Sequence, residues 1–160
     1  MDARSTFQLS LFDRLTEDEE VWNAISDDRE TVRINAYREY IRRDVEALLN
    51  AHRRFLPLAR EFEYARKSIL TFGVPDFSNE GYSTKDHREY LRDVIYETLT
   101  RHEPRLSNVV VEVVADKDEQ EHMLQFKISA FLRGAPENEA ILFDTALMAT
   151  DHSVIVEEGG

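Results

Sequence analysis

Glu103-Pro104-Arg105 divides the chain into a helical part and a β-patterned part. Pro104 cannot continue a helix because it has no N–H and a fixed φ, and it drives the preceding residue out of the helical region. Glu103 and Arg105 stand two residues apart, so in an extended segment both side chains lie on one face. We therefore expect a helix to end here and a strand to follow. The charge pair is either a structural clamp or a docking point.

Two main helices are predicted before this tripeptide. Apolar residues recur every three or four positions in residues 28–52 and again in residues 83–103, which is typical of helices with one buried stripe. The expected stripes are Ile34, Tyr37, Ile41, Val45 and Leu48 in the first helix, and Leu91, Val94, Ile95, Thr98 and Leu99 in the second.

Capping residues are predicted at three helix ends. Asp27 or Asp28 is expected to cap the first helix. The cations of residues 52–54 are expected to close it, where the helix dipole favours positive charge. Ser83 to Asp86 matches a capping box for the second helix.

Residues 106–160 predict successive strands joined by short charged turns. Val109, Val111 and Val113 share one face of the first strand, and Val110 and Val114 lie on the other, which predicts a central strand covered on both sides. Alternating apolar residues predict two further strands over 123–132 and 141–147, and a short fourth over 153–157. The predicted fold is α+β, with two main helices packed on a small, mainly antiparallel sheet formed by the C-terminal half.

The segment from Ser68 to Phe77 predicts a tight turn. Gly73, Pro75 and Asp76 are turn-forming residues, and we expect Phe72 and Phe77 to fix the turn in the core. We interpret this segment as a structural turn and not as a contact site.

Residues 1–28 differ in pattern from the single domain expected over residues 29–160. A short apolar cluster precedes the acidic run at residues 17–20, which is typical of a flexible docking segment that orders on binding. The alternative is that the cluster packs back on its own domain. The candidate contact residues are Leu11, Phe12, Asp13, Arg14 and Leu15.

Charge and composition exclude several classes of protein. The net charge of the 160 residues is −12, and residues 106–160 hold 3 basic and 11 acidic side chains, which argues against binding to nucleic acid. The absence of Cys excludes disulfides and thiolate zinc sites. No apolar run reaches the roughly 20 residues of a membrane span, and the N-terminus lacks the layout of a signal peptide. We expect a cytoplasmic protein without direct membrane insertion.

Catalytic and cofactor motifs are not found. The five histidines have no metal-ligand spacing, and the sequence contains no glycine-rich phosphate loop and no nucleophile elbow. Glu103 with a second carboxylate would suit glycoside hydrolysis, but Arg105 beside it tends to lower the pKa that a general acid needs raised. We expect no catalytic residue, metal, cofactor or small-molecule substrate.

Five stretches, taken in order, resemble the "lysozyme-like" baseplate wedge proteins of contractile machines. Within that group they are most similar to the TssE family of type VI secretion baseplate subunits. The Glu-Pro-Arg tripeptide before a valine-rich strand carries the general resemblance, and the ordered set of stretches narrows it. The stretches are Ser10 to Leu15, Arg43 to Asn50, Phe72 to Phe77, Glu103 to Arg105, and Phe143 to Thr145.

The resemblance implies a structural part and not an enzyme. Proteins of this family link the baseplate wedge to the first ring of the contractile sheath, in a baseplate assembled near the inner membrane. Glu103, Pro104 and Arg105 are implied to dock on the helical core bundle of partner wedge subunits, and the sheet to accept extended strands from the sheath. On this view we expect Arg105→Ala to keep the fold but lose the wedge partners. Two alternatives remain: a peptidoglycan hydrolase, and a wedge protein of a contractile phage or extracellular injection particle.

Overall fold

The computed structural model describes residues 7, 10–16, 23, 29–53, 61–75, 84–114, 123–133, 135, 140–148 and 153–159. The helices are α1 (Leu11–Thr16), α3 (Glu30–Asn50), α4 (Glu63–Arg66) and α5 (Lys85–His102), with the 3-10 helix η1 at Ile69–Thr71. The strands are β1 (His52–Arg53), β2 (Val74–Pro75), β3 (Leu106–Val114), β4 (Met123–Leu132), β5 (Ala140–Met148) and β6 (Val154–Glu158).

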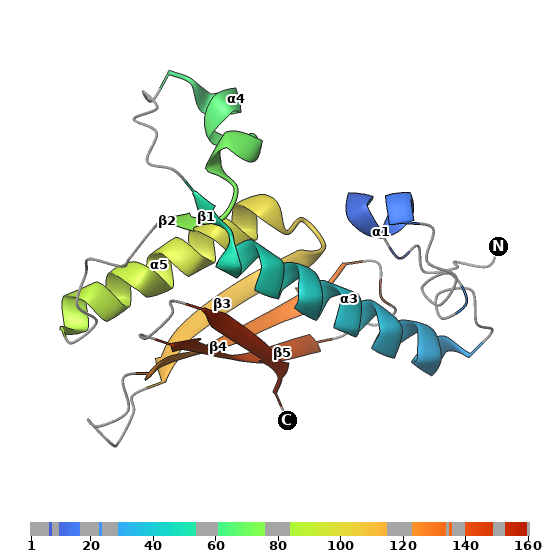
Figure 1. The fold of residues 1–160 in the computed structure, drawn as a ribbon. Helices are drawn as coiled ribbons and strands as arrows, with labels where there is room; N and C mark the ends of the chain where they lie inside the picture. Colours follow the sequence, from blue (N-terminus) through green and yellow to red (C-terminus); the bar gives the residue numbers. More distant parts are fainter. Residues whose placement is uncertain are drawn as a thin grey trace.

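The four long strands form one antiparallel sheet in the order β3-β4-β5-β6. Helices α3 and α5 lie on the same face of this sheet, α5 along β3 and α3 along β6 (Figure 1). The side chains on the other face are half-buried or exposed. This arrangement confirms the predicted α+β fold, with two main helices on a sheet formed by the C-terminal half.

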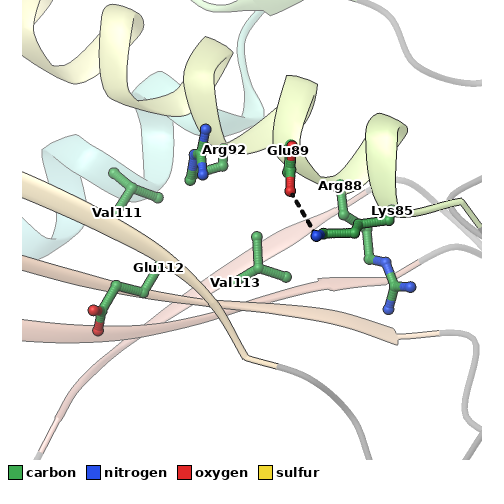
Figure 2. Close-up of a pocket in the computed structure, with 7 residues that line it drawn as sticks. All are labelled: Lys85, Arg88, Glu89, Arg92, Val111, Glu112 and Val113. Atoms are coloured by element: carbon green, nitrogen blue, oxygen red, sulfur yellow. Dashed lines mark ion pairs between the residues drawn. The ribbon is translucent and has the colours of Figure 1, made fainter.

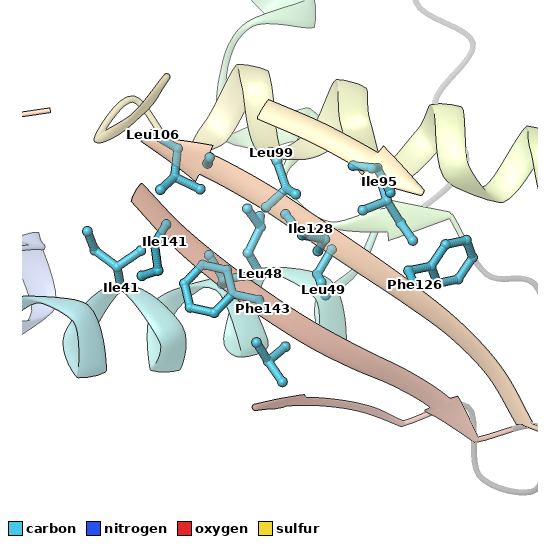
Figure 3. Packing of buried hydrophobic residues seen from close by; sticks show 14 of the residues in the cluster. Ile41, Leu48, Leu49, Ile95, Leu99, Leu106, Phe126, Ile128, Ile141 and Phe143 are labelled. Atoms are coloured by element: carbon cyan, nitrogen blue, oxygen red, sulfur yellow. The ribbon is translucent and has the colours of Figure 1, made fainter. Parts of the chain in front are cut away.

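The core lies between the two helices and the covered face of the sheet (Figure 3). Both predicted helix stripes face it, except that Ile34 near the start of α3 is only half-buried. Alternate residues of β4 and β5 fill the opposite side. Removal of these side chains from water is the main favourable contribution to folding. The largest fully buried core side chains include Tyr37, Ile41, Leu49, Leu99, Phe126, Ile128, Leu132 and Phe143.

Two helix ends differ from prediction. The N-cap of α5 is Thr84 and not Ser83, because Thr84 is extended and its Oγ1 accepts a 3.3 Å hydrogen bond from the N–H of His87. Helix α3 ends at Asn50, so residues 52–53 do not close it. They form β1 instead, which pairs in parallel with β2. Helix α3 follows Arg29, which makes no side-chain cap bond, and Asp27 and Asp28 lie outside the described residues.

Strand β3 lies at the edge of the sheet, so the prediction of a central strand was wrong. The strands follow one another as a meander, and β3 pairs only with β4. Val111 on the helix side is buried, whereas Val110 on the other face is 51% exposed. A bulge at residues 107–110, with Asn108 at φ 51°, bends β3 near its start.

Gly73 occupies a position that other residues cannot fill. Its φ is +89°, and a Cβ would lie 1.9 Å from the carbonyl oxygen of Ala51. The same carbonyl accepts a 2.8 Å hydrogen bond from the N–H of Val74, whose side chain is buried in the core. Phe72 is 41% exposed and does not fix the turn in the core; its ring lies edge-on to that of His102, 5.5 Å away. Pro75 pairs with Arg53, and Asp76 and Phe77 lie outside the described residues.

Candidate docking site

The Glu103-Pro104-Arg105 corner joins the end of α5 to the start of β3. The N–H of Glu103 donates to the carbonyl oxygen of Leu99 and so completes the last turn of α5. The carbonyl of Glu103 then accepts from the N–H of Leu106, the first residue of β3. Pro104 is the exposed residue at the tip of the corner. The helix-to-strand change therefore occurs where Pro104 predicts it.

Glu103 and Arg105 bind each other inside this corner. Nε of Arg105 lies 2.6 Å from Oε1 of Glu103, and Nη2 lies 2.5 Å from Oε2, so the pair is bidentate. Nη2 also donates to Oδ2 of Asp44 in the middle of α3, at 2.8 Å. The three side chains tie the corner to α3. Both motif residues are buried, with 4% of Glu103 and 7% of Arg105 exposed.

Negative charge exceeds positive charge among the three side chains of this network, Asp44, Glu103 and Arg105. One guanidinium serves two carboxylates, and Nη1 of Arg105 is buried without a hydrogen-bond partner among the described residues. Burial raises the pKa of Asp44 above its ordinary value, although the hydrogen bond from Arg105 acts in the opposite direction. Arg43 also lies 3.8 Å from Asp44, but Arg105 is the cation that binds both carboxylates, so the network depends on Arg105.

The geometry at Glu103 does not resemble that of a general acid. Both of its carboxylate oxygens are held by Arg105, and neither Glu103 nor Asp44 lines the described cavity beside α5. Within the described parts of the chain, no group of three or more His, Asp or Glu side chains is placed to hold a metal ion. None of the described helices is both long and apolar enough to cross a membrane.

Part of the N-terminal segment lies against α3. Asp13 is buried and forms an ion pair with Arg43, and its carboxylate also accepts a 2.7 Å hydrogen bond from Ser10. The ring of Phe7 packs against that of Tyr37 in a tilted arrangement, at a centroid distance of 4.7 Å. These contacts match the alternative in which the segment packs back on its own domain.

The other candidate contacts of this segment differ in exposure. Leu11 and Leu15 are 71% and 72% exposed and stand one helical turn apart on α1. They therefore present an apolar pair to solvent while Asp13 faces inward. The side chains of Phe12 and Arg14 lie outside the described residues.

Side chains of α3 cover the free edge of β6. Asn50 donates from Nδ2 to the carbonyl of Val154 at 2.8 Å and accepts from its N–H at 2.9 Å. Arg42 donates to the carbonyl of Val156 at 2.8 Å, and Glu46 accepts from its N–H at 3.3 Å. These three side chains occupy the outward-facing backbone groups of Val154 and Val156, which a fifth strand would need.

Sequence reasoning missed four residues of these networks. Asp44, Arg42, Glu46 and Asn50 all lie on α3, but only the fold shows that they reach the corner or β6. Three of the four, Asp44, Glu46 and Asn50, stand in the stretch from Arg43 to Asn50 that carries the family resemblance. The family resemblance of that stretch was the only feature of the sequence that pointed to these residues.

These features define the class: a small α+β domain with a buried ionic network at its helix-to-sheet corner. The family of the baseplate wedge protein gp25 matches residues 35–137, more than half of the 160-residue chain. The chain belongs to this family of baseplate wedge proteins, which are structural components of contractile injection machines. Neither a curated protein nor a solved structure matches the chain.

Proposed function

We propose that the protein is a baseplate component of a type VI secretion system that links the wedge to the first ring of the contractile sheath. The family match supports a place in the baseplate, and the five ordered stretches that resemble TssE favour the secretion system over a phage or an extracellular particle. The protein then acts in the cytoplasm, in a baseplate near the inner membrane, and templates sheath assembly. It has neither enzymatic activity nor a cofactor.

The docking point in this proposal is the Glu103-Pro104-Arg105 corner, on the helical core bundle of the partner wedge subunits. The observation that carries it is the burial of both charged residues in the network with Asp44. Because that network fixes the corner from inside, Pro104 is presented to a partner on a rigid support. A preorganised contact loses less conformational entropy on binding than a flexible one. The same corner then serves both as a structural clamp, through its buried ion pairs, and as a docking point, through Pro104.

A second attachment is proposed for α1. Its exposed pair, Leu11 and Leu15, offers an apolar contact, and the ion pair between Asp13 and Arg43 holds the helix against α3. Large apolar side chains exposed side by side are typical of surfaces that bind another protein.

A pull-down with the tagged, full-length chain tests the proposed function. The lysate must contain the other baseplate proteins and the sheath subunits of the same system. We expect wedge and sheath subunits to be recovered together, and recovery of neither would contradict the proposal. The purified chain should leave a suspension of cell walls turbid; clearance that disappears in Glu103→Gln would instead support a hydrolase.

A further inference from the structure

A short arm between β1 and β2 carries large apolar side chains that face solvent. The arm comprises residues 61–73, which include α4 and η1, and Figure 1 shows α4 standing away from the sheet. None of the residues of α4 or η1 is buried. Five large apolar side chains of the arm are 41% exposed or more, and they are Phe62, Tyr64, Ile69, Leu70 and Phe72. These side chains therefore add little to the core of their own domain.

Polar contacts, and not a core, fix the shape of this arm. Oγ of Ser68 accepts a 3.3 Å hydrogen bond from the N–H of Leu70 and donates a 2.7 Å bond to the carbonyl of Ala65. Oγ1 of Thr71 donates to the carbonyl of Arg66 at 2.8 Å. At the base of the arm, β1 pairs with β2. The arm therefore presents its apolar side chains in a preformed shape, which lowers the entropy lost on binding a partner.

The arm lies beside the Glu103-Pro104-Arg105 corner. Nε2 of His102, the last residue of α5, lies 2.9 Å from the carbonyl oxygen of Thr71 in η1. The ring of Phe72 lies edge-on to that of His102. Because His102 directly precedes the corner, the exposed side chains of η1 and the exposed Pro104 lie at the same end of the domain. This surface is separate from the cavity beside α5, which is lined by the first half of that helix (Figure 2).

Two guanidinium groups at this end of the domain have no ion-pair partner among the described residues. Arg66 on α4 is exposed, whereas the neighbouring Lys67 pairs with Glu63 at 2.5 Å. The second group belongs to Arg53, at the base of the arm. Burial lowers the pKa of His102, and the nearby charge of Arg53 adds to this effect. A guanidinium binds a carboxylate in a directional, bidentate manner, so this end of the domain suits an acidic partner.

We infer that the α4–η1 arm docks on an amphipathic helix of the partner wedge subunits. Apolar residues of that helix cover Ile69, Leu70 and Phe72. Carboxylates of the same helix meet the guanidinium of Arg66. A helix binds such a surface through apolar side chains spaced three or four positions apart. The inference rests on the proposed function, which supplies the helical bundle at Pro104, and it adds a neighbouring surface and the chemistry of the helix that binds there.

Photo-crosslinking tests which protein covers the arm. A benzophenone amino acid replaces Ile69 in the full-length chain during co-expression with the baseplate and sheath subunits. The control replaces Tyr90, which is 48% exposed and lies in the first half of α5. We expect position 69 to crosslink to a helical segment of a wedge subunit, and position 90 to give little product with wedge subunits. Linkage from position 69 to a sheath subunit or to a second copy of this chain, or a yield no higher than at position 90, would overturn the inference.

Two substitutions test the chemistry of the contact through recovery of wedge subunits in a pull-down. Ile69→Glu and Arg66→Glu change exposed side chains, so both variants should melt close to the unmodified protein. Each should lower recovery at least about tenfold, because one places a charge in an apolar contact and the other reverses a charge pair. The matched controls are Tyr90→Glu and Lys85→Glu, which breaks an exposed pair with Glu89 on α5. Both controls should recover the wedge subunits normally.

The outcomes separate this inference from the proposed function. Normal recovery by a folded Ile69→Glu variant would overturn the inference, and normal recovery by Arg66→Glu would overturn the acidic chemistry of the helix. If the unmodified chain recovers neither wedge nor sheath subunits, the proposed function itself fails. If the unmodified chain recovers both and the two variants do so too, only this inference fails.

Discussion

Nη2 of Arg105 lies 2.8 Å from Oδ2 of Asp44, and this contact joins the corner after α5 to the middle of α3. The same guanidinium holds both oxygens of Glu103. The residues that the sequence marks as a motif therefore face into the domain, and Pro104 between them faces out. This arrangement changes what substitutions at the corner should do.

Arg105→Ala should destabilise the fold, contrary to the expectation from sequence. Removing one member of a buried ionic group leaves uncompensated charge, so the free energy of unfolding should fall by about 3–5 kcal/mol. Arg105→Lys should lose less, because it keeps the charge but not the bidentate geometry. Urea denaturation measures both. Arg101→Ala, which removes a 3.6 Å pair with the exposed Glu97, serves as control and should cost less than about 1 kcal/mol. Equal stability of the two alanine variants would refute the structural role of Arg105.

Gly73→Ala should destabilise the turn that supports β2. The new Cβ would meet the carbonyl of Ala51, and a positive φ at a non-glycine residue adds strain, so we expect a loss of at least about 1–3 kcal/mol in the free energy of unfolding. Thermal unfolding followed by circular dichroism measures it. The control, Gly159→Ala, meets only side-chain atoms of Leu142 and Asp144 and should lose less. A Gly73→Ala variant as stable as the control would contradict this account of the turn.

Asn50→Ala should open the edge of β6. It removes two hydrogen bonds to the backbone of Val154, and at about 1 kcal/mol for each bond the free energy of unfolding should fall by about 1–2 kcal/mol. Hydrogen exchange gives a local readout, because the amide of Val154 should lose protection while that of Phe143 in β5 keeps it. Unchanged protection at Val154 would show that Asn50 does not cover this edge.

The partial burial of His102 should make stability depend on pH. Burial lowers the pKa of His102 below 6.5, although the hydrogen bond from its ring to the carbonyl of Thr71 opposes the shift. The unfolded chain then binds the proton more readily, so this contribution to stability is present above pH 6.5 and is lost as the pH falls through the folded pKa. The free energy of unfolding should therefore fall more between pH 7.5 and 5.5 in the unmodified protein than in His102→Gln. Equal changes in the two proteins would contradict the assignment.

Much of the fold could be predicted from local pattern. The apolar periodicity of α5 and the alternation in β4 depend on which face of an element is buried, and that information lies in the sequence itself. The position of β3 could not be predicted this way. Its five valines are typical of a covered central strand, but its place at the edge follows from the order of all four strands.

The position of the Glu103-Pro104-Arg105 corner could be predicted from the sequence, but its ion pair with Asp44 could not. Pro104 predicts where the helix ends, since its effect on the backbone is local. Besides Glu103, Arg105 binds Asp44, 61 residues earlier, and only the packing of α3 against α5 brings these two together. The covering of β6 by Asn50 is likewise a contact over 104 residues. Contacts between residues this far apart in the chain follow no helical or strand periodicity, so the sequence pattern does not predict them.

The most direct test of the central claim, that this corner docks the domain in the baseplate, is wedge recovery by Pro104→Arg. Pro104 is exposed, so the substitution should leave the melting temperature close to that of the unmodified protein while it places a bulky charge at the contact. Tyr96→Arg, on the exposed side of α5, is the matched control. We predict that Pro104→Arg lowers recovery of the wedge subunits at least about tenfold, as expected for a central interface residue, and that the control recovers them normally. Full recovery by a folded Pro104→Arg variant would contradict the claim.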